Sequence, residues 1–352
     1  MFRHKLVEPA PGLLLCIAVS AGATMLERLQ VPAFGRVWLE ALVMAILLGA
    51  LVRTFWSPGA RWISGVKFSA HTLLEIAVVL LGASVSMQTI LAAGPWLLGG
   101  IAAVVLMAIS VGYGVGRSLG LPHRMATLVA CGNSICGNSA IAAVSTIIGA
   151  DGEEISSSIA FTAVLGVVVV LILPPLARMW HLSGLQYGVL SGLTVYAVPQ
   201  VLAATAPLGP VAVQMGTLVK LVRVLMLGPV VLGLTLLARR SRDEPDASWP
   251  HVTAGNRPKP GRLPVHKLVP WYIAGFLVLA GARSLDLVPH PALGPIAFAV
   301  NVLTVISMAA LGLGTDIRAV ARAGASVTLT VALSLLILAA ISFGLIRLLH
   351  IA

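Results

Sequence analysis

The sequence predicts an all-α, polytopic membrane protein, and three observations lead to this fold class. Of the 352 residues, 58% are hydrophobic and only 10% are charged. A soluble domain carries about 25% charged residues, so a water-soluble globule could not bury this much apolar surface. The mean hydropathy is +1.00. The apolar residues also fall into runs of about 20, which is the length that a helix needs to cross a bilayer.

About eleven such runs can be placed along the chain. We expect them to form one integral membrane domain over residues 1–352, with the polar, Pro-rich stretch 238–268 as a flexible cytoplasmic loop inside it. The expected transmembrane helices are 11–27, 37–54, 68–88, 94–116, 123–149, 155–177, 185–205, 211–237, 269–285, 293–314 and 325–347.

The basic residues orient these helices. With the N-terminus inside, seventeen of the 23 Lys and Arg residues fall in inside segments and four fall outside. This bias favours a cytoplasmic N-terminus and a periplasmic C-terminus. It also accounts for the net charge of +11 without a nucleic-acid partner. The cluster Asp151, Glu153 and Glu154 is expected outside.

Enzyme and cofactor signatures are missing from the sequence. The chain has no GxSxG, HExxH, Walker or dinucleotide-binding motif. Cys16, Cys131 and Cys136 form no CxxC pair, and no base lies next to Cys131 or Cys136 to activate a thiol. We therefore expect no enzyme activity, no cofactor and no metal site.

A possible internal repeat links two segments at an offset of 230. Residues 81–94 read LGASVSMQTILAAG and residues 311–324 read LGLGTDIRAVARAG. In the expected topology the two copies point in opposite directions, as inverted repeats of secondary transporters do. Chance matching in an Ala-, Gly- and Leu-rich sequence is the alternative. Asp316, in the second copy, is expected to cap a helix.

The tetrad Cys-Gly-Asn-Ser occurs twice in the fifth span, as Cys131–Ser134 and Cys136–Ser139. Glycine weakens a helix and Asn and Ser compete for its backbone hydrogen bonds. We expect two half-helices that meet near the bilayer centre, with the second starting near Asn138 or Ser139. Its free N–H groups suit an anion, while the carbonyls of the break suit Na⁺. Polar helix packing is the alternative. The expected substrate-binding residues are Asn133, Ser134, Gly137, Asn138 and Ser139.

The seventh span contains Pro199 and Gln200, and the proline removes a helix hydrogen bond beside the glutamine. Gln200, Thr194 and Tyr196 could face a cavity at this point. An ordinary proline kink is the equally good alternative.

The eighth and third spans carry charged residues. Lys220 and Arg223 lie on one helix face, where they could attract an anion. Pairing with Glu75 or Glu40 is the alternative. Glu75 and His71 lie one turn apart in the third span and could carry a coupling proton, or they could be solvated at the interface.

Together, the twin tetrads, the LGAS segment from Leu81, the V-P-Q-V segment 198–201 and the K-L-V-R segment 220–223 resemble the YeiH-type, UPF0324 family of bacterial inner membrane proteins. The resemblance implies a relationship to the bile acid/arsenite/riboflavin-type transporter superfamily. It also implies crossed, discontinuous helices and sulfate or another sulfur oxyanion as substrate. The chain has Tyr196-Ala197 where some members have a His-Glu pair.

These observations favour a secondary transporter that moves a small anion across the bacterial inner membrane by alternating access. An anion channel or a non-transporting membrane sensor is the alternative. The expected partners are the small anion, H⁺ or Na⁺ as coupling ion, and the lipid bilayer, and assembly as a homo-oligomer is compatible with the sequence.

Overall fold

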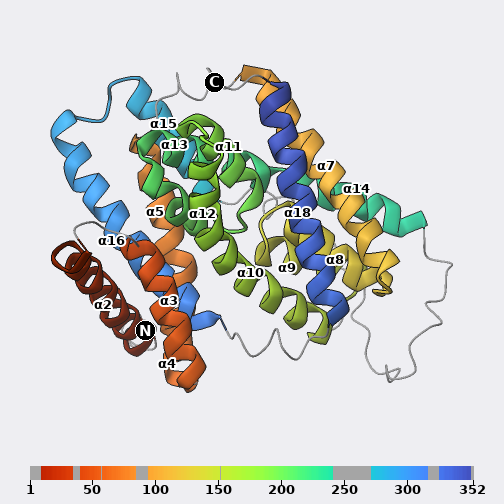
Figure 1. Ribbon diagram of the computed structural model, residues 1–352, viewed down its shortest axis with the longest axis horizontal. Coiled ribbons are helices and arrows are strands. Elements are labelled where there is room, and N and C mark those ends of the chain that lie inside the picture. Colours follow the sequence, from red (N-terminus) through yellow and green to blue (C-terminus); the bar gives the residue numbers. More distant parts are fainter. Residues whose placement is uncertain are drawn as a thin grey trace, which may run out of the picture.

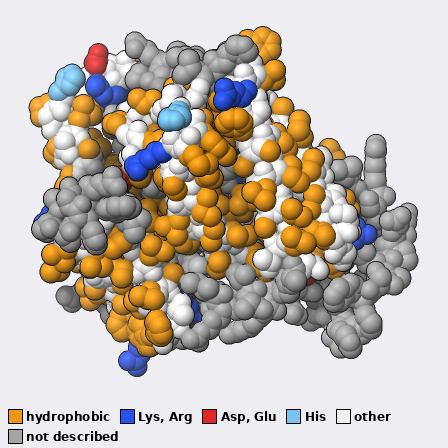
Figure 2. All heavy atoms as spheres, in the orientation of Figure 1, with side chains coloured by type: hydrophobic (Ala, Val, Ile, Leu, Met, Phe, Trp, Pro, Cys, Tyr) orange, Lys and Arg blue, Asp and Glu red, His pale blue; other side chains and the backbone are white. Residues whose placement is uncertain are grey.

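Every element that the computed structural model describes is helical, as the sequence predicts (Figure 1). Seven of the described helices are long and apolar enough to cross a membrane, and shorter apolar helices accompany them. Among the described residues, hydrophobic side chains predominate on the face in Figure 2, and few charged side chains lie among them. The described residues are 9–34, 40–56, 58–84, 94–150, 152–240, 271–315 and 325–349.

A first bundle lies at the left of Figure 1. Small residues allow its helices to approach closely: a Cβ atom on Gly49 of α3 would lie 2.9 Å from Cα of Gly312 in α16. The bundle consists of α2 (Ala10–Phe34), α3 (Ala41–Phe55), α4 (Ala60–Phe68), the π-helical turn η1 (Ser69–Leu73), α5 (Leu74–Leu81), the 3₁₀ turn η2 (Gly82–Ser84), α15 (Trp271–Ser284) and α16 (His290–Gly314).

A second bundle fills the centre and right of Figure 1. Its helices pack mainly on one another, with α11 against α13 and α7 against α8 and α18, and they touch the first bundle chiefly through α12 and α10. The bundle consists of α7 (Gly94–Ser118), α8 (His123–Ser134), α9 (Asn138–Ile148), α10 (Gly152–Met179), α11 (Gly184–Thr194), α12 (Val198–Thr205), η3 (Ala206–Leu208), α13 (Pro210–Leu225), α14 (Leu227–Arg240) and α18 (Ala325–Leu348).

The expected span 185–205 does not cross the membrane, because the chain turns back between α11 and α12. The hydroxyl of Tyr187, near the start of α11, donates to the carbonyl of Ala204, near the end of α12, at 2.8 Å. In a continuous helix these two residues would be about 25 Å apart. The two helices therefore form a re-entrant hairpin, and the prediction of a crossing helix is wrong.

The expected span 123–149 also turns back. Gly132 of α8 packs against Ile141 of α9. Along α10, Ser158 contacts Met125 near the start of α8, and Thr162, one turn later, contacts Asn138 at the start of α9. The chain leaving α9 has therefore returned to the level at which α8 begins. An apolar run of suitable length fits both a crossing helix and a hairpin, and for this reason the run alone predicted the wrong path.

The two hairpins enter the protein from opposite sides. Met125 of α8 packs with Val327 at the start of α18. Trp180, just before the α11–α12 hairpin, packs on Phe343 near the end of α18, with 5.6 Å between the ring centroids. Arg178 and the start of α10 therefore lie on opposite sides.

This arrangement corrects the expected placement of the acidic cluster. The beginning of α10, which includes Glu154, lies on the same side as the beginning of α8, whereas the sequence predicted opposite sides. Asp151 lies outside the described residues.

The helix of the third expected span begins earlier than predicted, at Ala60, and runs through α4, η1 and α5 to Leu81. Three other predictions concern residues outside the described part of the chain: most of the loop 238–268, most of the two copies of the repeat at 81–94 and 311–324, and Asp316.

Candidate functional site

The structure confirms that the twin tetrads interrupt a helix. α8 ends at Ser134 and α9 begins at Asn138, which agrees with the predicted start of the second half-helix. Gly137 makes the turn with a φ of 68° and a ψ of −121°, a conformation that residues with a Cβ rarely adopt. The glycine of the second tetrad is therefore required by the shape of the backbone.

A second interruption lies between α11 and α12. α11 ends at Thr194, and α12 begins at Val198 with Pro199 in its first turn. The N–H groups of a first turn have no partner within the helix, so the missing N–H of a proline costs no helical hydrogen bond there. The amide of Ala197 donates to Oε1 of Gln200 at 3.2 Å. The proline therefore starts a helix instead of kinking one, and Gln200 holds the turn that precedes it.

The tips of the two hairpins are in direct contact. The hydroxyl of Tyr196 donates to Oδ1 of Asn133 at 2.9 Å, and Nδ2 of Asn133 donates to the carbonyl of Val331 in α18 at 3.2 Å. Asn133 and Tyr196 are both almost completely buried. The predicted binding residue Asn133 therefore joins the two tips and is not part of the lining of the main cavity described below.

Lys220 joins the ends of α8 and α11. Its Nζ donates to the carbonyl of Ile135 at 2.7 Å and to the carbonyl of Val195 at 3.0 Å. Each acceptor is the residue that follows the last residue of its half-helix. The ammonium group thus supplies hydrogen bonds that the interrupted helices cannot make for themselves.

Arg223, one turn further along α13, makes the same kind of bridge. Its Nε donates to the carbonyl of Ser134 at 2.7 Å, and it has no solvent exposure. The guanidinium also donates to the carbonyls of Asn133, Gly192, Leu193 and Val195. The negative ends of both half-helix dipoles therefore point at one guanidinium group.

These contacts revise the predicted roles of the cations. Neither Lys220 nor Arg223 forms an ion pair with Glu75 or Glu40, all of which lie in the described part of the chain, so the alternative of such a pairing is wrong. Neither Arg223 nor Ser134 lines the main cavity, and both are buried. Lys220 does reach the cavity wall.

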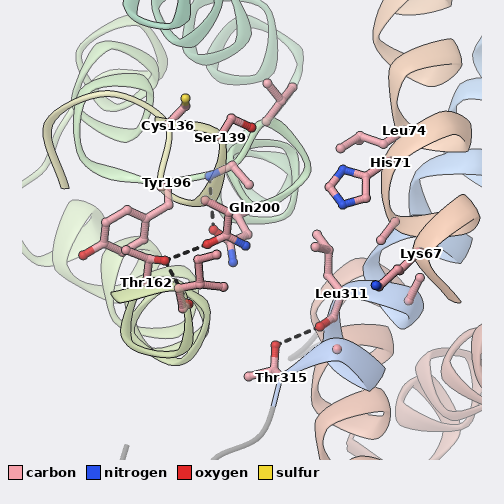
Figure 3. Close-up of a pocket in the computed structure, with 18 of the residues that line it drawn as sticks. Lys67, His71, Leu74, Cys136, Ser139, Thr162, Tyr196, Gln200, Leu311 and Thr315 are labelled. Atoms are coloured by element: carbon pink, nitrogen blue, oxygen red, sulfur yellow. Dashed lines mark hydrogen bonds between the residues drawn. The ribbon is translucent and has the colours of Figure 1, made fainter. Parts of the chain in front are cut away.

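The main cavity lies between the two bundles and has a volume of about 650 Å³. The first residues of α9 and α12 open onto one wall, and Figure 3 shows Ser139, Gln200, Tyr196 and Thr162 gathered on it. Asn138 and Ser139 are exposed to this space. The predicted residues that line the cavity are Gly137, Asn138, Ser139, Gln200, Lys220, His71 and Glu75.

The opposite wall comes from the first bundle. Lys67, His71 and Leu74 lie on α4, η1 and α5 across the cavity from the hairpin tips (Figure 3). His71 sits in the π-helical turn, a feature that is frequent at functional sites. Glu75 accepts a hydrogen bond from Nε1 of Trp271 at 2.8 Å.

Sequence reasoning missed several polar residues of the cavity, among them Thr162 and Lys67. Thr162 of α10 donates from Oγ1 to Oδ1 of Asn138 at 2.7 Å and so orients the first side chain of α9. Lys67 adds a basic group on the other wall. Thr162 lies in a long apolar run without any unusual neighbour, so no local signal marked it, and Lys67 stood among residues assigned to an inside loop.

Comparison with known proteins identifies the family. A family described as Conserved hypothetical protein 698 matches residues 11–331. A UPF0324 membrane protein of Brucella melitensis is 56% identical over 352 residues, which cover 100% of this chain and 94% of the relative. One from Bradyrhizobium diazoefficiens is 56% identical over 337 residues, covering 96% and 92%. One from Bacillus cereus is 33% identical over 284 residues, covering 80% and 79%. The chain therefore belongs to the UPF0324 family of multi-pass membrane proteins.

Proposed function

We propose that this membrane protein is a secondary transporter for a small anion and that it works by alternating access. One observation carries the proposal: the N-terminal ends of two half-helices, α9 and α12, open into the same cavity, with Lys220 in its wall. Helix N-termini present free N–H groups and a positive dipole end, and both favour an anion.

The charges at the hairpin tips support this choice. Four half-helix ends meet there: the C-terminal ends of α8 and α11, which are negative, and the N-terminal ends of α9 and α12, which are positive. Each end is equivalent to about half an elementary charge, so the four dipole charges sum to about zero. The negative ends are covered by Lys220 and Arg223, whereas the positive ends remain open to the cavity. Because a guanidinium group is always charged in proteins, the tips carry a net positive charge. The same surplus counts against Na⁺ at the break, since the carbonyls that could bind it already accept hydrogen bonds from these two residues.

The arrangement of the bundles suits alternating access. The cavity lies at the seam between them, where they touch through few elements, so one bundle can shift against the other without breaking its own packing. The two hairpins enter from opposite sides, which is the arrangement that an inverted repeat would produce.

Glu75 and His71 are the proposed coupling groups. Both line the cavity on the bundle opposite the hairpin tips, so movement between the bundles would change their distance from the bound anion. A proton carried by either group would then be linked to transport of the anion.

We further propose that the protein lies in the bacterial inner membrane with a cytoplasmic N-terminus. The corrected topology moves Arg178 to the side that carries few basic residues. Most of the Lys and Arg residues remain on the other side. That side carries Arg61, Lys67, Arg117 and Arg124, and the positive-inside rule makes it cytoplasmic.

Proteoliposome exchange tests the transport proposal. The purified protein is reconstituted with unlabelled sulfate inside, and uptake of labelled sulfate, sulfite and thiosulfate is followed with and without a pH gradient. A transporter gives uptake that saturates and is accelerated by anion on the opposite side. Uptake that never saturates and shows no exchange would identify a channel. No uptake and no binding of any anion would contradict the proposal.

A further inference from the structure

The cavity is much larger than an inorganic oxyanion requires. Sulfate has five heavy atoms and displaces about three waters, or roughly 90 Å³ at about 30 Å³ per water. The cavity holds about 650 Å³, within the range of about 300–1,000 Å³ that is typical of sites for organic ligands.

The lining of the cavity is divided by polarity. The hairpin tips supply a polar wall, with Asn138 and Ser139, and Lys220 of α13 lies buried behind them. Away from the tips, Lys67, His71 and Glu75 line the side of the first bundle. Between them and the tips, aliphatic side chains form a continuous part of the lining: Leu74 and Val78 on α5, Ile155 and Ile159 on α10, and Leu311 on α16. Figure 3 shows Leu74 and Leu311 across the open space from Ser139 and Gln200.

We infer that the substrate is an organic anion, with an oxyanion head group on a compact apolar body. The inference rests on the proposed function and names the substrate class for that site. The head group binds at the N-terminal ends of α9 and α12, and the body lies against the aliphatic residues of α5, α10 and α16. Bare sulfate fills only the polar end and leaves the aliphatic wall in contact with water.

The physical reason is the hydrophobic effect. Sulfate carries two negative charges and a sulfonate carries one, so the comparison that isolates the apolar body is the one among alkanesulfonates, which share the same head group. Each methylene that leaves water for the aliphatic wall adds affinity, about fourfold per CH₂ for full burial. The site should therefore rank alkanesulfonates by chain length until the cavity is filled.

A homologous series of ligands tests this inference. The dissociation constants of sulfate, methanesulfonate, butanesulfonate and hexanesulfonate are measured by calorimetry on the full-length protein in nanodiscs. Empty nanodiscs correct for partition into lipid, and hexanol tests whether the charge is needed. We expect hexanesulfonate to bind at least about tenfold more tightly than methanesulfonate, with hexanol much weaker than either.

A variant in the aliphatic wall provides the second measurement. Leu74→Trp occupies space opposite the hairpin tips, and Leu14→Trp, at a side chain that is 64% exposed on α2, is the matched control. We expect Leu74→Trp to remove the advantage of hexanesulfonate and to leave methanesulfonate binding within about twofold, because only the apolar body loses its place. The control should behave as the unmodified protein.

The outcomes separate the two proposals. Equal affinity along the series, or equal loss of methanesulfonate and hexanesulfonate binding in Leu74→Trp, would overturn the inference and leave the anion transporter standing. If none of the anions binds, the proposed function itself fails. Tight binding of hexanol would show an apolar crevice without an anion site and would overturn both.

Discussion

Arg223 in α13 donates from Nε to the carbonyl of Ser134, the last residue of α8, at 2.7 Å. The same guanidinium donates to carbonyls at the end of α11. This helix belongs to the α11–α12 hairpin, which enters from the opposite side of the protein. One side chain therefore holds the carbonyl ends of both interrupted helices. The intramembrane charge that first suggested a substrate ligand is instead part of the scaffold that presents the two N-terminal ends.

Removal of Arg223 should destabilise the protein strongly. In Arg223→Met several buried carbonyls lose their donor, and each unsatisfied buried group costs about 1–3 kcal/mol. We expect a clear loss of thermal stability in detergent, measured by the fraction that remains monodisperse after heating. Arg223→Lys should give an intermediate loss, since an ammonium group reaches fewer carbonyls. Arg61→Met, at an exposed position, is the control. Equal stability of Arg223→Met and the control would show that the bridge is unimportant.

The corrected topology predicts which loops share a side of the membrane. Single cysteines at Gly120, Gly152 and His181, all exposed, are introduced after Cys16, Cys131 and Cys136 have been replaced. A membrane-impermeant maleimide should label Gly120→Cys and Gly152→Cys from one side and His181→Cys from the other. The hairpin α8–α9 is the reason, because it returns the chain to its side of entry. Labelling of the first two positions from opposite sides would show that the segment 123–149 crosses the membrane after all.

Gly137→Ala should disrupt the tip of the first hairpin. Its φ of 68° is strained for alanine, and the new Cβ would lie 3.3 Å from Cβ of Tyr196. We expect a loss of about 1–3 kcal/mol in stability and weaker anion binding. Gly120→Ala is the matched control, because its φ of 83° is also positive but the added Cβ meets nothing within 4 Å. If both variants lose the same stability, contact between the tips contributes nothing.

A negative charge at Ser139 should separate helix stability from anion binding. An acidic residue in the first turn of a helix stabilises it, so Ser139→Asp should fold as well as the unmodified protein. Its carboxylate would lie in the cavity and repel an anion, and we expect the affinity for methanesulfonate to fall about tenfold or more. His290→Asp, at the first residue of α16, is the control outside this cavity. If the affinity for methanesulfonate is unchanged in Ser139→Asp, the anion does not bind at the N-terminal end of α9.

The sequence by itself determined the fold class and one of the two helix interruptions. Scarce charge and apolar runs of helical length leave a helical membrane protein as the stable solution, because no backbone group may stay unpaired in lipid. The twin tetrads located the start of α9 at Asn138, since glycine and short polar side chains are local signals. Pro199 was ambiguous, because a proline can either kink a helix or begin one.

Only the tertiary structure decided the direction of the chain after each interruption and the role of the buried cations. An apolar run of about 20 residues has the length of one crossing or of two half-crossings, so its hydropathy is the same for both. The return of α9 and α12 is set by contacts from distant elements, such as Thr162 with Asn138 and Tyr187 with Ala204. Lys220 was recognisable as a buried charge, but its partners are backbone carbonyls, which every residue has and no sequence pattern distinguishes.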